Sequence, residues 1–301
     1  IKVANKTILN LNDCDIKNIS QLNFIKKISG KIDVLLVQFS YATGKSNYDE
    51  REIRKDLANS ILNKLSENIK SIDPKVVIPF ASFCYFSNYN NFYLNDSINK
   101  IEYTINFLKK KNPNTIFKCF YPGDVWDLKS DWDNELVIKK YNYDYSKIKP
   151  KIKNIQQFNY NDLLIISKKF INTTKKNNSL FYFYNIFNKK FHKIYFKLTD
   201  LNKNYFFDFD KGLIEIDFVE NYNPICKLDS ESLYQLFSSG YGYDALIIGG
   251  RFEANKEGLK SLDKIFKFQA KNYQNIFYNY KYLYLKILNM LLSTNKIYHK
   301  R

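Results

Sequence analysis

Short apolar runs alternate with segments of helical period over the first part of the chain. Residues 32–39 are almost wholly apolar, which is typical of a strand covered on both faces. The segment 49–69 has an apolar residue at every fourth position from Ile53 to Leu65, which predicts an amphipathic helix. Further strands are predicted at 6–11, 75–79 and 115–120, and further helices at 19–28 and 97–110. This alternation predicts an α/β fold for the first part of the chain.

A second pattern begins after a charged, irregular stretch at 127–158, which we interpret as a linker. Beyond it, apolar and polar residues alternate as they do in a half-exposed antiparallel sheet, with strands predicted at 191–199, 205–209 and 213–218. Helices are predicted at 163–171, 230–237, 258–270 and 276–292, with Asp229 as an N-cap. The expected organisation is an α/β domain at 1–126, the linker, and a smaller α+β domain at 159–301.

The charge of the chain is high but evenly spread. The formal net charge is +17, and the lysines are scattered over the whole length with few arginines among them. We interpret them as a solvated surface, since nucleic-acid binding usually gathers Arg and Lys on one face. No apolar window of 18 residues exists, so no membrane span is expected. Segment 276–292 comes closest, but Lys and Asn interrupt it at helical spacing, which predicts an amphipathic helix against the core.

The cysteines and the first residue bear on the cellular compartment of the protein and on whether the chain is part of a longer one. The four cysteines lie far apart and form no Cys-x-x-Cys pair, so a zinc ribbon is not indicated. No signal peptide is visible, and a cytoplasmic protein is expected. The chain starts at Ile1 and its single Met is Met290, which suggests the later part of a longer protein.

Asp13 is the first candidate for chemistry. It follows a short apolar strand directly, with Asn12 before it and Asp15 close behind. A strand end holds a carboxylate within the tight tolerance that a metal ion or a transferred proton requires. Asp13 is therefore a candidate metal ligand. The alternative is a strand-end turn in which the side chain satisfies local backbone groups.

The loop at 79–96 is rich in aromatic residues and neutral amides. Such groups suit recognition of a polar organic ligand better than acid–base chemistry. The candidate substrate-binding residues are Ser82, Tyr85, Asn88 and Asn91. The alternative is a packed loop whose Asn residues satisfy turns.

Asp124 follows a further strand, presented by a Pro122-Gly123 turn, and is the candidate catalytic acid. The carboxyl ends of parallel strands share one edge of a sheet, so Asp13, the 79–96 loop and Asp124 are expected to converge. Tyr41 and Lys45 are expected to face the same edge and to bind substrate.

The segment 44–46, Arg251 and the two histidines give weaker indications of function. Gly44-Lys45-Ser46 is not a P-loop, because Phe39 stands where that motif needs its first glycine. Arg251 is expected to pair with Glu253 or to cap a helix, although it could bind an anion. The two histidines, His192 and His299, have no metal-ligand spacing to any other residue.

Several of these segments together resemble the metallo-β-lactamase-fold superfamily, in particular the branch around CMP-N-acetylneuraminate hydroxylase and lactonase-like proteins. The resemblance covers about residues 6–126. It rests on the strand end Asn12-Asp13-Cys14, the run 33–42, the loop 79–86 and the turn 122–126. The segment 249–253 is similar to a C-terminal extension of some of these proteins, which implies a sterol-carrier-like second domain.

This resemblance implies part of an αββα sandwich and a metal-dependent hydrolase or oxygenase, acting with zinc or iron on a polar or anionic small molecule such as a sugar derivative. Asp13 would be the later acidic ligand that bridges two metals. The family's His-x-His-x-Asp-His motif is not present in this chain, and Asn88 stands where relatives could carry a His. The chain alone is therefore expected to lack a full dinuclear site and to be inactive.

Two rival hypotheses remain. One is a non-catalytic ligand-binding module of the same fold. The other is a nucleic-acid phosphodiesterase, which the scattered lysines disfavour and which would bind with a steep salt dependence. The sequence does not indicate an oligomeric state.

Overall fold

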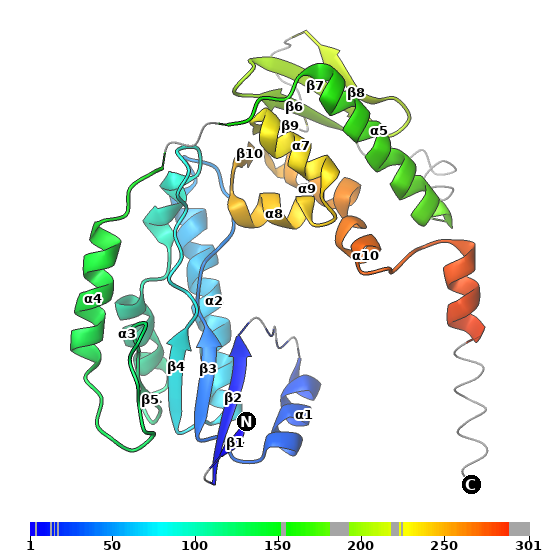
Figure 1. Cartoon of the computed structure of the whole chain (residues 1–301). Helices are drawn as coiled ribbons and strands as arrows, with labels where there is room; N and C mark the ends of the chain where they lie inside the picture. The colour runs from blue at the N-terminus through cyan, green and yellow to red at the C-terminus, as the bar shows by residue number, and fades with distance from the viewer. Residues whose placement is uncertain are drawn as a thin grey trace. The chain divides into compact units, whose positions relative to one another are not determined.

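The computed structural model divides the chain into two compact units (Figure 1). The first comprises Ile1–Ala42 and Tyr48–Ile152, and the second comprises Thr43–Asn47 and Lys153–Arg301. The structure describes residues 1–3, 5–12, 14, 16, 18–151, 155–180, 193–217, 223 and 225–288. The predictions for Asp13, Asp15, His192, His299 and Met290 lie outside these residues.

The first unit is built on a five-stranded sheet in the order β1-β2-β3-β4-β5. β2 to β5 run parallel, and the short β1 pairs antiparallel with β2. The strands are β1 (Lys2–Val3), β2 (Lys6–Asn12), β3 (Val34–Gln38), β4 (Val76–Phe80) and β5 (Ile116–Phe117). The α/β class predicted from the sequence is confirmed.

Helices pack this sheet, as α2 shows behind the strands in Figure 1. They are α1 (Ile19–Ser29), α2 (Arg51–Ile72), the 3₁₀ turn η1 (Phe92–Ser97), α3 (Ile101–Lys111) and α4 (Asn134–Ser146). In α2 the buried apolar stripe runs through Ala58, Leu62, Leu65, Ile69 and Ile72. Of the four predicted stripe positions only Leu65 is buried, because the buried face of the helix lies one residue further along than predicted: Ile53 is exposed, and Leu57 and Ile61 are half-buried. The helix ends at Ile72, and its C-cap Asp73 has a left-handed backbone and donates its N–H to the Ile69 carbonyl.

Helix α4 lies inside the segment that we interpreted as a linker. Its N-cap, Asp133, accepts hydrogen bonds from the N–H groups of Glu135 and Leu136. Val137 and Tyr145 are buried in the first unit. The linker interpretation differs from the structure because tyrosines, Tyr141 and Tyr145, share the packing face of this helix with Val137 and Ile138, and their polar hydroxyls hide the apolar pattern in the sequence. The first unit therefore extends to Ile152.

The second unit is built on a five-stranded sheet in the order β10-β9-β6-β7-β8. β6 and β9 are parallel and the other neighbours antiparallel, so the sheet is mixed. The strands are β6 (Ile194–Leu198), β7 (Lys203–Asp208), β8 (Gly212–Ile216), β9 (Ile225–Leu228) and β10 (Phe252–Ala254). The sequence predicted β6, β7 and β8. β9 and β10 are only four and three residues long and were missed.

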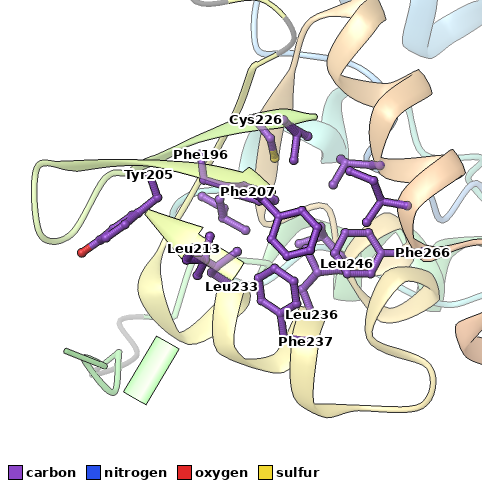
Figure 2. Close-up of a cluster of buried hydrophobic side chains, with 14 of the residues drawn as sticks. Phe196, Tyr205, Phe207, Leu213, Cys226, Leu233, Leu236, Phe237, Leu246 and Phe266 are labelled. Carbon is purple, nitrogen blue, oxygen red and sulfur yellow. The ribbon is translucent and has the colours of Figure 1, made fainter. Parts of the chain in front are cut away.

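Helices pack against the second sheet around an aromatic core. They are α5 (Tyr160–Asn177), α7 (Ser230–Ser238), α8 (Gly242–Gly249), α9 (Lys256–Phe266) and α10 (Gln269–Tyr273). Figure 2 shows the rings of Phe207, Phe237 and Phe266 meeting in this core. The ring centroids of Phe207 and Phe237 are 5.1 Å apart, and those of Phe237 and Phe266 are 5.4 Å apart. Asp229 is the N-cap of α7, as predicted, and accepts a hydrogen bond from the Ser232 N–H.

The last described residues depart from the sequence-based expectation. Residues 280–288 are helical, but most of their large apolar side chains are exposed, for example Tyr284 and Leu285. The described part of segment 276–292 is thus a helix that does not bury its apolar side chains in a core. Within the described ranges, no helix has the length and hydropathy needed to cross a membrane.

Candidate ligand-binding site at the edge of the first sheet

The ends of β3 and β4 are tied together by one hydroxyl. Ser82 Oγ accepts hydrogen bonds from the N–H groups of Phe39 and Ser40, at 2.8 and 3.0 Å, and donates to the Phe80 carbonyl at 3.0 Å. Ser82 is buried, and all three bonds are to backbone. The hydroxyl that the sequence marked for substrate therefore holds the edge of the sheet in shape.

The thiol of Cys84 lies two residues beyond Ser82 and its hydrogen bonds. Cys84 is half-buried, and its N–H donates to the Ser82 carbonyl at 3.0 Å. Burial raises the pKa of the Cys84 thiol, while a hydrogen bond with the Ser40 side chain acts in the opposite direction. The thiol is therefore protonated at neutral pH and is suited to packing or weak hydrogen bonding rather than to nucleophilic attack.

Four aromatic rings form a ledge beside Cys84. Phe83 contacts two tyrosines of α4, with centroid distances of 5.6 Å to Tyr141 and 4.6 Å to Tyr145. Tyr121, which follows β5, meets Tyr141 edge-on at 5.1 Å. We call Phe83, Tyr121, Tyr141 and Tyr145 the aromatic ledge. Phe83 is 41% exposed, so the ledge offers an accessible ring.

Asp124 lies at one end of the ledge in a tight turn. Its Oδ2 accepts a hydrogen bond from the Tyr121 N–H at 2.8 Å, and its Oδ1 lies 3.7 Å from Lys140 Nζ. The Tyr121 hydroxyl donates to Asp144 at 2.6 Å, and this hydrogen bond raises the pKa of Tyr121. One carboxylate oxygen of Asp124 is thus engaged locally. Its predicted role as a catalytic acid stays a prediction.

The amides of the 79–96 loop shape the loop itself. Asn91 Oδ1 accepts from the Asn88 N–H at 2.9 Å, and Asn88 Oδ1 accepts from the Asn90 N–H at 3.1 Å. Asn95 bonds the Phe86 backbone in both directions, at 2.8 and 2.7 Å. These contacts fit the packed-loop alternative. Tyr85 is half-buried, and its substrate-binding role, like those of Asn88 and Asn91, stays a prediction.

A buried cation fixes the far end of this loop. Arg54 of α2 forms a two-pronged ion pair with Asp96, with Nε and Nη2 at 3.0 and 2.8 Å from the carboxylate oxygens. Arg54 also lies over the Tyr93 ring at 5.0 Å.

Tyr41 is fully buried, so a ligand cannot reach it unless the fold opens.

Two predicted residues belong to the second unit. Lys45 is exposed in the segment Thr43–Asn47 and is therefore outside the compact unit that holds the aromatic ledge. Arg251 does not pair with Glu253 in the way the sequence suggested. Its Nη2 instead bonds Asp229 at 2.8 Å and Glu231 at 3.0 Å, because β9 brings the start of α7 beside the end of α8.

The described residues do not fit a zinc or iron site. In the described ranges, no three His, Cys, Asp or Glu side chains gather closely enough to hold a metal ion. Asn88 uses its Oδ1 within a turn. Asp13, the predicted ligand, is outside the described residues.

Sequence reasoning missed the helix α4 side of the site. Tyr141 and Tyr145 are four residues apart, which places both on one helical face, and this spacing is the signal that could have found them. The sequence pattern of this segment predicts a linker, and it therefore does not predict the contact of these tyrosines with Phe83.

No protein-family model, curated protein or solved structure matches this chain.

Proposed function

We propose that the first unit binds a polar or anionic small molecule, such as a sugar derivative, on the aromatic ledge. The observation that carries the proposal is that Phe83 after β4, Tyr121 after β5 and Tyr141 of α4 meet in one row of rings. Aromatic faces pack against the apolar face of a sugar ring, and nearby charged groups bond its hydroxyls. Asp124 and Lys140 supply such groups at the end of the row.

We further propose that this unit has a metallo-β-lactamase-like fold. The support is the sequence resemblance over 6–126, together with a parallel sheet whose strand ends carry the resembling segments. The four cysteines are free thiols, in keeping with the cytoplasmic setting that we propose.

A metal-dependent hydrolase or oxygenase is the second candidate function. One observation favours it: the β2–β3 register shifts between Asn10 and Asn12, and Asn12 has a φ of 31°, directly before Asp13. Bulges and left-handed backbone at a strand end often aim a functional side chain. The described residues supply no ligand set for a metal ion.

Ligand-detected NMR of the whole chain with N-acetylneuraminate and N-acetylglucosamine tests the binding proposal. We expect saturation transfer to the sugar, and at least about fivefold weaker binding in Phe83→Ala, since a stacking ring contributes roughly 1 kcal/mol or more. Phe24→Ala removes a ring that is exposed on α1 and is the matched control. Unchanged binding in Phe83→Ala contradicts the proposal, as does the absence of binding by either sugar.

The second candidate is tested separately by metal content. The purified chain is loaded with Zn²⁺ or Fe²⁺ under reducing conditions, dialysed and analysed for bound metal beside Asp13→Ala. Stoichiometric metal that is lost in Asp13→Ala supports the hydrolase or oxygenase. No retained metal, or equal retention in the variant, removes it and leaves the binding proposal standing.

A further inference from the structure

A cavity of about 280 Å³ lies in the second unit. Helix α5, the end of α7 and helix α10 line it. Its size is just below the usual range for small-molecule sites, about 300–1,000 Å³. It therefore suits a compact organic molecule better than a sterol or a long acyl chain.

One whole face of α5 forms the first wall. The residues on this wall recur at helical spacing and are Ile166, Lys169, Phe170, Thr173, Thr174 and Asn177. Within this face, Lys169, Thr173 and Asn177 are four residues apart and form a polar stripe. Phe170 lies beside the stripe and is buried, which gives the wall one apolar and one polar side.

The apolar floor is rigid. Phe170 and Phe237 meet edge-to-face with centroids 5.5 Å apart, and both belong to the core of the unit. Gln269 of α10 is also buried. Its Nε2 donates to the Leu236 carbonyl at 2.6 Å, and its Oε1 accepts from the Tyr243 N–H at 2.9 Å. The floor is thus fixed before any ligand arrives.

The residues around the opening of the cavity are also held in place by contacts with one another. Gly240 lies so close to the Tyr273 ring that a Cβ at this position would overlap it. Asn178 and Asn272 exchange two side-chain hydrogen bonds, at 2.8 and 3.1 Å, which join the end of α5 to α10. These contacts hold the three walls at a fixed spacing.

The charged groups that line the cavity indicate which kind of ligand it would bind. Among the described residues that line the cavity, Lys169 is the single charged one, and none carries a carboxylate. Two of the carbonyls near the end of α7 are engaged: Gln235 accepts from the Ser239 N–H, and Leu236 accepts from Gln269. The part of the chain that the structure describes offers no hydrogen-bond partner to the side chains of Lys169, Thr173 or Asn177.

We propose that this cavity binds a small carboxylate with an aromatic or branched apolar body. The carboxylate pairs with Lys169 and accepts from Thr173 or Asn177, because a charged acceptor forms the strongest hydrogen bonds with such donors. The apolar body lies on Phe170 and Phe237. This site is independent of the aromatic ledge, since all its residues belong to the second unit.

Protein-observed NMR of the whole chain with phenylacetate, 4-phenylbutyrate and 4-phenylbutylamine tests the proposal. At about 5 mM each, even millimolar affinity is detected. We expect the two acids to bind and the amine to bind at least about tenfold more weakly, since its ammonium faces Lys169. Equal affinity for acid and amine overturns the proposal, and so does failure of both acids to bind.

Variants on exposed positions of α5 locate the site. Lys169→Met should weaken acid binding about tenfold while Lys169→Arg retains it, because only the charge is required. Thr173→Trp should block the cavity without disturbing the core. Lys176→Met is the matched control, since Lys176 is exposed on α5 and does not line the cavity. Equal losses in Lys169→Met and Lys176→Met, or unimpaired binding in a folded Thr173→Trp, contradict the assignment.

Discussion

The side-chain amide of Asn47 pairs with the backbone of Ala254 in both directions. Asn47 Nδ2 donates to the Ala254 carbonyl at 3.1 Å, and the Ala254 N–H donates to Asn47 Oδ1 at 3.0 Å. Ala254 ends β10, an edge strand whose outer backbone groups need partners. The side-chain amide of Asn47 thus makes the two hydrogen bonds that the backbone of a neighbouring strand would otherwise make with Ala254. This explains why residues 43–47 belong to the second unit although they lie between two segments of the first.

Gly44, in the same segment, packs closely against the backbone of Gly250. Its N–H donates to the Ile247 carbonyl at 2.6 Å, and a Cβ at this position would overlap the Gly250 backbone. We expect Gly44→Ala to lower the free energy of unfolding by about 1–3 kcal/mol, because backbone must move to make room. Urea unfolding followed by far-UV circular dichroism measures the change.

Gly249→Ala is the matched control for Gly44→Ala. Gly249 ends α8, and a Cβ there meets no atom within 4 Å. Alanine favours helix over glycine, so this variant should be neutral or slightly more stable. If Gly44→Ala behaves in the same way, the close approach of Gly44 to Gly250 does not contribute to stability.

Much of the first unit could be predicted from sequence periodicity. The apolar run 32–39 contains β3, and the helical spacing of 49–69 contains most of α2. Such patterns reflect burial by neighbours along the sheet. Short edge strands such as β10 have too few residues to show a period, and their stability comes from partners that are distant in sequence, such as Asn47.

The candidate site was predicted less completely than the fold. The sequence located the 79–86 loop and the 121–124 turn at strand ends, and both contribute rings to the ledge. It could not show that Ser82 and Asn91 are committed to backbone groups, because hydrogen-bond partners depend on tertiary approach. The place of Lys45 was not predictable either, since it depends on the glycine contact of its neighbour Gly44.

Ser82→Ala tests whether the hydroxyl is structural. The change leaves the buried N–H groups of Phe39 and Ser40 without their acceptor, which should cost about 2 kcal/mol. Both tryptophans, Trp126 and Trp132, are in the first unit, so tryptophan fluorescence during urea unfolding reports this change.

Ser60→Ala serves as the control for the hydroxyl. Ser60 is exposed on α2 and bonds only the local Leu57 carbonyl, so its loss should stay within about 0.5 kcal/mol. A Ser82→Ala variant as stable as Ser60→Ala would leave the hydroxyl of Ser82 open for a ligand instead.

Asp96 neutralises a cation that the first unit has buried. Asp96→Ala leaves Arg54 without its carboxylate partner and should cost about 3–5 kcal/mol. The double variant Arg54→Met with Asp96→Ala should lose less, because the uncompensated charge is gone. Asp56→Ala, at an exposed position of α2, is the control. Simple additivity of the two changes, measured by tryptophan fluorescence in urea, contradicts the pairing.

Asp33 couples the start of the parallel sheet to pH. Its Oδ2 accepts from the Thr7 N–H of β2 at 3.0 Å, and its Oδ1 lies 3.0 Å from Lys75 Nζ, just before β4. The backbone hydrogen bond from Thr7 and the hydrogen bond from Lys75 together lower the pKa of Asp33 from 3.8 to about 2. A carboxyl with a lowered pKa stabilises the fold above its unfolded-state pKa, and this contribution is lost as pH falls toward the folded-state value.

Asp33→Asn should therefore be less stable than the native chain at neutral pH, and the gap should close between about pH 4 and pH 2. Tryptophan fluorescence in urea at each pH measures it. Asp127, whose pKa is also lowered to about 2, by backbone hydrogen bonds from Ser130 and Lys129, is present in both chains and cancels in the comparison. A gap that stays constant down to pH 2 would show that Asp33 is not the group whose ionisation holds β2, β3 and β4 together, because only a titrating carboxylate loses its advantage over an amide in acid.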